Sequence, residues 1–329
     1  MASPKTAVKV VFGAMTFGAE GKEQARTHDL AAAAEILDVL QAHGHSEVDT
    51  ARTYAGGTSE EYLGQLDWRA RGLTLATKIS PRSGVWRHDG PGLREALRQS
   101  LSALKADKVD MWYLHAPDRS VAYEETLRVV DELHREGKFD RFGISNYAAW
   151  EVAQISEICI REGWIRPTAY QGVYNALHRA VEPELFPCLR KYGISFYEFN
   201  PLAGGYLTDR YHRDQEEVEA GSRFDPKRNQ GANYRRRYWK SEYFDALDVL
   251  RPVAKRHGLT EAECALRWIQ NHSLLSGEAG DAVIIGASSK EQLEENLVNM
   301  EKGPLPQEVL DALDEGWAKV KGVCASYFH

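Results

Sequence analysis

Short apolar runs alternate with helix-like segments along most of the chain, and this alternation limits the fold more than any other feature of the sequence. Polar or aromatic residues close the runs at positions 49, 78, 115, 146, 171 and 199. The spacing is close to the roughly 30 residues that one strand, one helix and their connections require. Because strands that alternate with helices pair in parallel, the pattern predicts a parallel sheet covered by helices.

The positions of the individual elements follow from the period of the apolar residues. We expect strands at residues 8–12, 45–49, 73–77, 109–114, 139–144, 168–171, 194–199 and 281–285. We expect helices at residues 30–42, 91–104, 123–135, 148–161, 183–192, 244–257, 260–271, 290–300 and 307–320. Capping boxes that begin at Thr58 and Ser289 predict the start of a short second helix and of the helix over residues 290–300.

The last two strands are much further apart than the others, because a segment rich in Gly, Arg and Tyr lies between Leu202 and Lys240. Eight strands and eight helices fit a (β/α)8 TIM barrel with a long loop after strand seven and an additional C-terminal helix and tail. A doubly wound open sheet is the alternative, but Gly13 to Gly18 lacks its Gly-x-Gly-x-x-Gly turn. No linker divides the chain, so we predict one domain over residues 1–329.

Four residues that can transfer or stabilise a proton lie at the ends of three consecutive strands: Asp49 with Tyr54, then Lys78, then His115. TIM-barrel active sites form at the carboxyl ends of the strands, so we expect these side chains to meet. Tyr54 is the candidate proton donor to a carbonyl oxygen, and a nearby Lys78 ammonium is expected to lower the pKa of its phenol. Asp49 would keep Lys78 charged, and His115 would hydrogen-bond the carbonyl oxygen or relay the proton.

These four residues match the catalytic tetrad of the aldo-keto reductases, and the sequence resembles that family over nearly its whole length. It is most similar to the branch of aflatoxin-aldehyde and succinic semialdehyde reductases. The resemblance implies NADPH-dependent reduction of aldehydes, and of some ketones and dicarbonyls, to alcohols by hydride transfer. It is carried by Val48-Asp-Thr-Ala, Tyr113-Leu-His-Ala-Pro-Asp118, Gly143-Ile-Ser-Asn-Tyr-Ala-Ala-Trp150, Phe199-Asn-Pro-Leu-Ala-Gly-Gly205 and Gln292-Leu-Glu-Glu-Asn296.

The tetrad carries no hydride, so a reductase needs a cofactor, and the resemblance implies NADPH/NADP+. Ser145, Asn146 and Gln171 follow adjacent strands and can bind a carboxamide with their donors and acceptors, and the family uses these positions for the nicotinamide amide. Phe199 stands where the family stacks an aromatic ring on the nicotinamide.

Glycines and a helix N-terminus suit the phosphates of such a cofactor. An Arg is common in the family where this chain has Gln292, so Arg210 and Arg223 are expected to supply the positive charge that favours NADPH. The resemblance assigns the rest of the cofactor site to Asn200, Pro201, Leu202, Gly204, Gly286, Ser288, Gln292, Glu295 and Asn296.

A substrate pocket with aromatic walls and a cationic rim is expected from loops at the same face, and such a rim suits an aldehyde that carries a carboxylate. The family resemblance implies that the tail folds over the mouth. This tail ends in His329 where related mammalian chains end in Arg, which weighs against carboxylate-bearing substrates. The other candidate substrate residues are Met15, Trp86, Tyr234, Arg237 and Trp239.

The net charge of −7 argues against a nucleic-acid partner or an anionic membrane. We find no signal peptide at the N-terminus and no apolar run of the roughly 18 residues that a membrane span needs. Four widely spaced cysteines without a Cys-x-x-Cys pair indicate reduced thiols, so we expect a cytoplasmic protein whose partner is a small-molecule carbonyl substrate.

Two other functions are alternatives to the reductase. A nucleotide-binding regulatory subunit of the potassium-channel beta type is the alternative within the same resemblance, although the first strand begins close to Met1, which favours the enzyme. A metal-dependent hydrolase is disfavoured, because no strand carries a His-x-His pair of ligands. The resemblance also suggests a homodimer.

Overall fold

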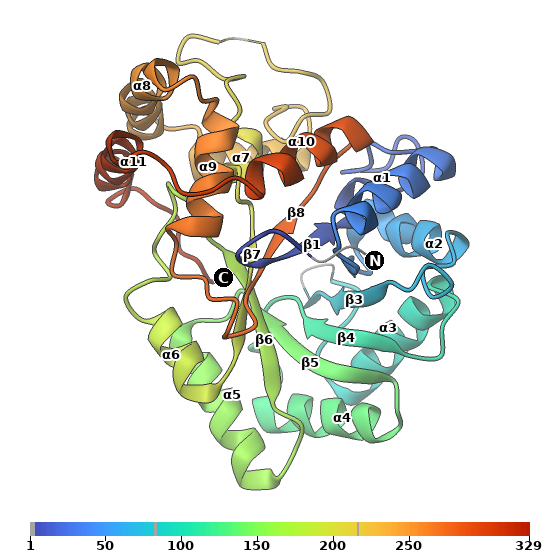
Figure 1. Cartoon of the computed structure of the whole chain (residues 1–329). Coiled ribbons are helices and arrows are strands. Elements are labelled where there is room, and N and C mark those ends of the chain that lie inside the picture. The colour runs from blue at the N-terminus through green and yellow to red at the C-terminus, as the bar shows by residue number, and fades with distance from the viewer. Residues whose placement is uncertain (1–3, 82–83, 216) are drawn as a thin grey trace.

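The computed structural model describes residues 4–81, 84–215 and 217–329, and Figure 1 shows helices arranged around a central sheet. Each strand pairs in parallel with the next and the last pairs with the first, so the sheet closes into a barrel. The predicted (β/α)8 TIM barrel is confirmed. The strands are β1 (Lys9–Gly13), β2 (Glu47–Asp49), β3 (Thr74–Ile79), β4 (Val109–Leu114), β5 (Phe139–Ser145), β6 (Pro167–Val173), β7 (Ser195–Phe199) and β8 (Ala282–Ile285).

The helices that cover the barrel lie within a few residues of their expected positions, with the exception of α7. α8 and α11 pack against each other at one edge of the molecule (Figure 1). Within the described part of the chain, no helix is long and apolar enough to cross a membrane. The helices are α1 (Leu30–Ala42), α2 (Thr58–Gln65), α3 (Gly90–Ala103), α4 (Tyr123–Arg135), α5 (Ala149–Glu162), α6 (Leu185–Tyr192), α7 (Asn229–Tyr238), α8 (Ser241–Arg256), α9 (Glu261–Asn271), α10 (Lys290–Met300) and α11 (Gln307–Val320).

Helix α7 lies inside the segment that we expected to be a loop. Only Gly231 and Tyr238 of this helix are buried, so it lacks the apolar stripe by which a helix is recognised in a sequence. A Cβ on Gly231 would lie 1.7 Å from the carbonyl oxygen of Asp225, so the helix packs closely on the chain that precedes it. Close backbone contact and polar contacts therefore hold α7 in place.

The two expected capping boxes have different outcomes. Ser289 caps α10 as predicted, because its hydroxyl accepts a hydrogen bond from the backbone N–H of Gln292 at 3.2 Å. The cap at Thr58 is wrong, since Gly57 precedes the helix with a φ of +98° and the Thr58 hydroxyl donates to the Ala55 carbonyl at 2.7 Å. The tight turn around Tyr54 places Thr58 one residue too far into the helix to cap it.

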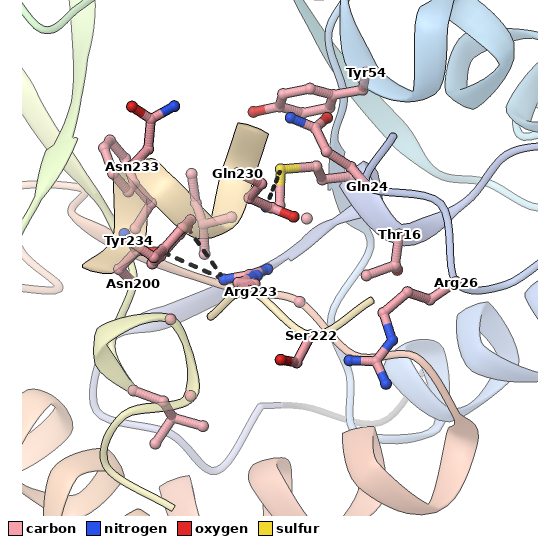
Figure 2. Close-up of a pocket in the computed structure, with 18 of the residues that line it drawn as sticks. Thr16, Gln24, Arg26, Tyr54, Asn200, Ser222, Arg223, Gln230, Asn233 and Tyr234 are labelled. Carbon is pink, nitrogen blue, oxygen red and sulfur yellow. Dashed lines mark hydrogen bonds between the residues drawn. The ribbon is translucent and has the colours of Figure 1, made fainter. Parts of the chain in front are cut away.

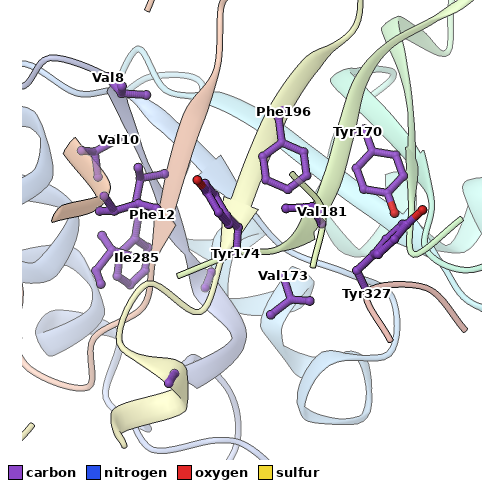
Figure 3. Packing of buried hydrophobic residues seen from close by; sticks show 14 of the residues in the cluster. Val8, Val10, Phe12, Tyr170, Val173, Tyr174, Val181, Phe196, Ile285 and Tyr327 are labelled. Carbon is purple, nitrogen blue, oxygen red and sulfur yellow. The ribbon is translucent and has the colours of Figure 1, made fainter. Parts of the chain in front are cut away.

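A cluster of side chains packs inside the barrel. A larger apolar layer lies between the barrel and the helices (Figure 3). A Cβ on Gly143 of β5 would lie 2.3 Å from the Tyr113 ring, so this strand position accepts only glycine beside that ring. The interior cluster consists of Val11, Ala76, Met111, Tyr113, Ala169, Tyr197, Ala282 and Ile284, with Phe199 packed against it.

Glu198 is an exception to the apolar layer outside the barrel. Its neighbours Tyr197 and Phe199 belong to the interior cluster, so Glu198 points the opposite way, towards the helices. The side chain is fully buried, and neither carboxyl oxygen has a hydrogen-bond partner among the described residues. Burial raises the pKa of the Glu198 carboxyl well above its ordinary value.

The Glu198→Gln variant should be more stable than the wild type by a margin that grows with pH. The pKa of Glu198 is raised only in the folded state, so this carboxyl does not reduce wild-type stability below about pH 4.3. Above that pH the wild type loses stability until the pH reaches the folded-state pKa. We expect an advantage on the order of 1 to 3 kcal/mol at neutral pH, measured by urea unfolding at several pH values. The exposed Glu278→Gln change is the control, and an advantage that does not vary with pH would contradict this account.

Candidate active site

A cavity of about 480 Å³ opens at the carboxyl ends of the barrel strands. Its walls come from the loop after β1, the ends of β2 and β4 to β8, the segment after β7, α7 and the chain terminus. Figure 2 shows labelled side chains from the loop after β1, from the segment that precedes α7 and from α7 itself around this space. The cavity therefore lies where a TIM barrel places its chemistry.

A buried ion pair between Asp49 and Lys78 forms the floor of this site. The Lys78 ammonium donates hydrogen bonds to the Asp49 carboxylate and, at 2.8 Å, to the Thr50 carbonyl. The second carboxylate oxygen of Asp49 accepts from the Gln171 amide at 2.9 Å. Lys78 is fully buried, whereas Asp49 reaches the cavity wall, so the pair connects the barrel interior to the cavity.

Tyr54 and His115 stand above the ion pair and line the cavity. Their rings meet edge to face with centroids 5.8 Å apart. The Lys78 ammonium nitrogen lies 5.0 Å from the centroid of the Tyr54 ring. The structure thus brings together all four residues of the tetrad, which sequence reasoning placed on three separate strands.

The pKa shifts at this site are dominated by burial. Burial raises the pKa of the Asp49 carboxyl and lowers the pKa of the Lys78 ammonium, and the attraction between the two charges opposes both shifts. Burial, followed by the Asp49 charge, raises the pKa of the Tyr54 phenol well above its ordinary value. The lowering of this pKa that we expected from Lys78 is not seen in the resting site, where burial prevails and the Lys78 ammonium is directed to Asp49 and Thr50. Tyr54 holds its proton at neutral pH, as a proton donor must.

The amide side chains beside the tetrad are held in fixed positions. Asn146 has a φ of +64°, a conformation that asparagine tolerates, and its amide donates to the His115 carbonyl and to the Ser145 hydroxyl, both at 2.9 Å. Asn146 and Gln171 line the cavity, whereas the fully buried Ser145 supports Asn146 from behind. Since Gln171 also binds Asp49, any group bound by these amides is coupled to the ion pair.

Buried donors without partners line the route from β7 towards α10. Within the described residues, the side-chain amide nitrogens of Asn200 and Asn296 have no hydrogen-bond partner. The carbonyl oxygen of the Asn200 side chain accepts from the Tyr234 hydroxyl at 3.0 Å and from Arg223 at 3.4 Å. Unpaired buried donors are costly, so this row of donors fits an anionic, oxygen-rich ligand such as a nucleotide.

The cationic side chains in this region surround the N-terminus of α10. Thr27 donates to the Ser288 carbonyl at 3.3 Å, which places the neighbouring Arg26 beside that N-terminus. Arg26 and Arg210 both pair with Glu219, at 2.6 and 3.5 Å, and Arg26, Arg210 and Arg223 all line the cavity. Positive charge and a helix N-terminus together suit a phosphate group.

Most of the site residues that we inferred from the sequence line the one cavity. Glu295 and Asn296 lie on α10 outside its lining, Lys78 and Ser145 lie beneath it, and Trp86 and Trp239 are not brought to it. Those that line it are Met15, Asp49, Tyr54, His115, Asn146, Gln171, Phe199, Asn200, Pro201, Leu202, Gly204, Arg210, Arg223, Tyr234, Arg237, Gly286, Ser288, Gln292 and His329.

Trp239 illustrates why an aromatic residue near the site need not belong to it. Its ring packs against Tyr211, Phe224 and Phe244 with centroid distances of 5.4, 5.5 and 5.3 Å. This aromatic cluster supports the segment between β7 and α8 from behind. The expected aromatic wall is thus supplied by Tyr54, Phe199 and other residues, and Trp239 contributes packing instead.

Sequence reasoning missed several polar residues that line the cavity. Those on α7 lie on one face of the helix, but no apolar stripe marks this helix in the sequence. Those after β1 lie in a segment without any periodic signal. The missed residues include Thr16, Glu23, Gln24, Arg26, Thr53, Thr208, Ser222, Asn229, Gln230 and Asn233.

The chain terminus folds back over the site, as expected. The backbone N–H of His329 donates to the backbone carbonyl of Asn146 at 3.1 Å, and His329 lines the cavity. Tyr327 anchors the tail, because its buried hydroxyl donates to Glu184 and accepts from the Ala149 amide at 3.1 Å. The terminus therefore contacts the same residue that supports His115.

Comparison with known proteins agrees with this geometry. A model of the aldo/keto reductase family matches residues 9–318. An aldo-keto reductase of Pseudocercospora fijiensis is 53% identical over 296 residues, which cover 89% of this chain and all of that protein. The aldo-keto reductase pigE of Monascus ruber is 47% identical over 99% of both chains. Aflatoxin B1 aldehyde reductase member 2 of Homo sapiens is 43% identical over 99% of this chain and 90% of its own.

These matches extend from the first strand of the barrel to the last helix, and they include every strand end at which the tetrad lies. An identity of this size over nearly the whole of both chains goes with a shared fold and a shared active-site face. The chain belongs to the aldo/keto reductase family.

Proposed function

We propose that this protein reduces aldehydes to alcohols with NADPH as the cofactor and Tyr54 as the general acid. The observation that carries the proposal is a phenol that lines an open cavity, with its ring centroid 5.0 Å from the ammonium of a buried Asp49–Lys78 pair. The family to which the chain belongs, and relatives whose names describe an aldehyde reductase, support the same reaction class. Bound NADPH supplies the hydride that reaches the carbonyl carbon.

The residues of the chain would then handle the proton and the position of the carbonyl group. Tyr54 donates its phenolic proton to the carbonyl oxygen, and the adjacent Lys78 stabilises the phenolate that remains. Asp49 keeps Lys78 charged and fixed, while His115, packed against the edge of the Tyr54 ring, orients the carbonyl oxygen. Asn146, Gln171 and Phe199 line the cavity, and they would hold the nicotinamide, the two amides by its carboxamide and Phe199 by its ring.

The preference for NADPH over NADH rests on the charged residues around α10. Arg26, Arg210 and Arg223 line the cavity. The side-chain oxygen of Gln292 accepts hydrogen bonds from the Ser288 backbone N–H and hydroxyl, at 2.9 and 3.2 Å. Arginines rather than Gln292 would therefore bind the additional 2′-phosphate of NADPH. Arg237 and His329 also line the cavity and would favour polar aldehydes.

Replacing Tyr54 with Phe removes the proton donor while the ring that packs against His115 remains. We expect the reduction of succinic semialdehyde and of an aromatic aldehyde to slow by at least about a hundredfold, because general acid catalysis contributes that much or more. The measurement is the loss of NADPH absorbance. Wild-type protein that binds NADPH but reduces neither aldehyde, nor any of a wider carbonyl panel, would instead support a regulatory subunit of the potassium-channel beta type.

Lys78→Met leaves the Asp49 carboxylate buried without its cation. The free energy of unfolding should fall by about 3 to 5 kcal/mol, measured by urea denaturation. The double variant Asp49→Asn with Lys78→Met removes both charges and should recover most of that stability, yet its rate of aldehyde reduction should stay low. A double variant that is no more stable than Lys78→Met alone would show that the charge imbalance is not the cause.

Arg210→Met should weaken NADPH binding by about tenfold and NADH binding by less than about twofold, because only NADPH carries the 2′-phosphate. The dissociation constants are measured by quenching of protein fluorescence. Arg213→Met is the matched control, since Arg213 lies in the same segment but pairs with Asp245 and Asp248 and does not line the cavity. Equal weakening of both nucleotides by Arg210→Met would argue against a role in phosphate selection.

A further inference from the structure

Gln24, in the loop after β1, has a backbone conformation that glutamine rarely adopts. Its φ is +75°, in the left-handed region that costs an L-residue about 1 to 2 kcal/mol. Strain of this kind persists where surrounding contacts impose it, and it is concentrated at functional sites. The neighbouring Gly21 has a similar φ of +80° without such a cost. A glutamine in place of a glycine at position 24 therefore suggests a use for its side chain.

The residues on either side of Gln24 are tied to other parts of the cavity wall. The Glu23 carboxylate accepts from the backbone N–H of Gln230 at 3.2 Å and pairs with Arg228 at 3.7 Å, at the start of α7. On the other side, Arg26 pairs with Glu219 at 2.6 Å, and its own amide donates to the Thr16 carbonyl at 2.8 Å. Gln24 thus sits between two fixed points.

The Gln24 side chain projects into the cavity from the same side as Tyr54. In the view of Figure 2, the Gln24 side chain extends towards the ring of Tyr54. Both residues line the cavity. The side-chain oxygen of Gln24 is buried and has no hydrogen-bond partner among the described residues. An unpaired acceptor near the proton donor is a position for a donor that belongs to the substrate.

We propose that Gln24 selects aldehydes that carry a hydroxyl group on the carbon next to the carbonyl carbon. The inference rests on the proposed function, because it assumes that Tyr54 marks the place of the reacting carbonyl. A hydroxyl on the carbon next to that carbonyl can donate to the free acceptor of the amide and accept from its NH2 group. The amide therefore satisfies both roles of the hydroxyl, and an aldehyde without the hydroxyl leaves the amide unpaired. Gln24 is a specificity residue in this account, and the proton transfer stays with Tyr54.

The test compares two aldehydes that differ only in that hydroxyl, 2-hydroxypropanal and propanal. In Gln24→Met, which keeps the length of the side chain and removes its polar atoms, kcat/KM for 2-hydroxypropanal should fall by about tenfold. The kcat/KM for propanal and the dissociation constant of NADPH should change by less than about twofold. Gln24→Gly relieves the backbone strain and should lose the same preference, which separates the amide from the backbone. Gln65→Met, at an exposed site on α2, is the control.

The outcomes distinguish this inference from the reaction on which it rests. A selective loss with the hydroxyaldehyde in both Gln24 variants supports it. Equal losses with both aldehydes, or a raised dissociation constant for NADPH, would show that the amide serves the cofactor or the loop, and would overturn the inference alone. Wild-type protein that reduces neither aldehyde would overturn the proposed function, and this inference with it.

Discussion

The buried pair of Asp49 and Lys78 is the interaction on which the site depends. Two opposite charges inside a barrel lose most of their hydration, and only close pairing with further hydrogen bonds offsets that loss. Thr50 and Gln171 supply those bonds, so β2, β3 and β6 are all held in register at the active-site end. The same bonds fix Gln171 in the position proposed for the nicotinamide amide, which makes the tetrad and the cofactor pocket parts of one network.

The cavity above this pair is built by segments that are far apart in the sequence. The loop after β1 and the segment from β7 to α7 meet across it, and ion pairs such as Glu23 with Arg228 and Arg26 with Glu219 join them. Exposed ion pairs contribute little to stability, so these contacts matter mainly for the shape of the wall. They hold polar side chains over a barrel whose interior is apolar. The barrel residues therefore determine packing, and the loop residues determine which ligands the cavity binds.

The electrostatics of the site favour a proton donor that stays protonated until it reacts. Burial raises the pKa of Tyr54, and Lys78 is occupied by Asp49, so the resting phenol is a weak acid. A developing negative charge on the carbonyl oxygen changes this balance, because the cation beneath the ring can then stabilise the phenolate. Tyr54 therefore keeps its proton in the resting site and donates it when negative charge develops on the carbonyl oxygen.

The sequence by itself determined the barrel, the order of its elements and the four residues of the tetrad, because strand and helix periodicity and strand-end positions are local properties. The fold prediction was confirmed, with element ends within a few residues of their expected positions, and the tetrad residues do meet. Only the tertiary structure decided that Trp239 packs behind the site, that α7 replaces an expected loop, and that Gln24 and Arg26 reach the cavity. These features depend on contacts between segments that are distant in the sequence. They also depend on whether the cost of burying a charge is offset by its partners. Neither condition produces a periodic pattern in the sequence.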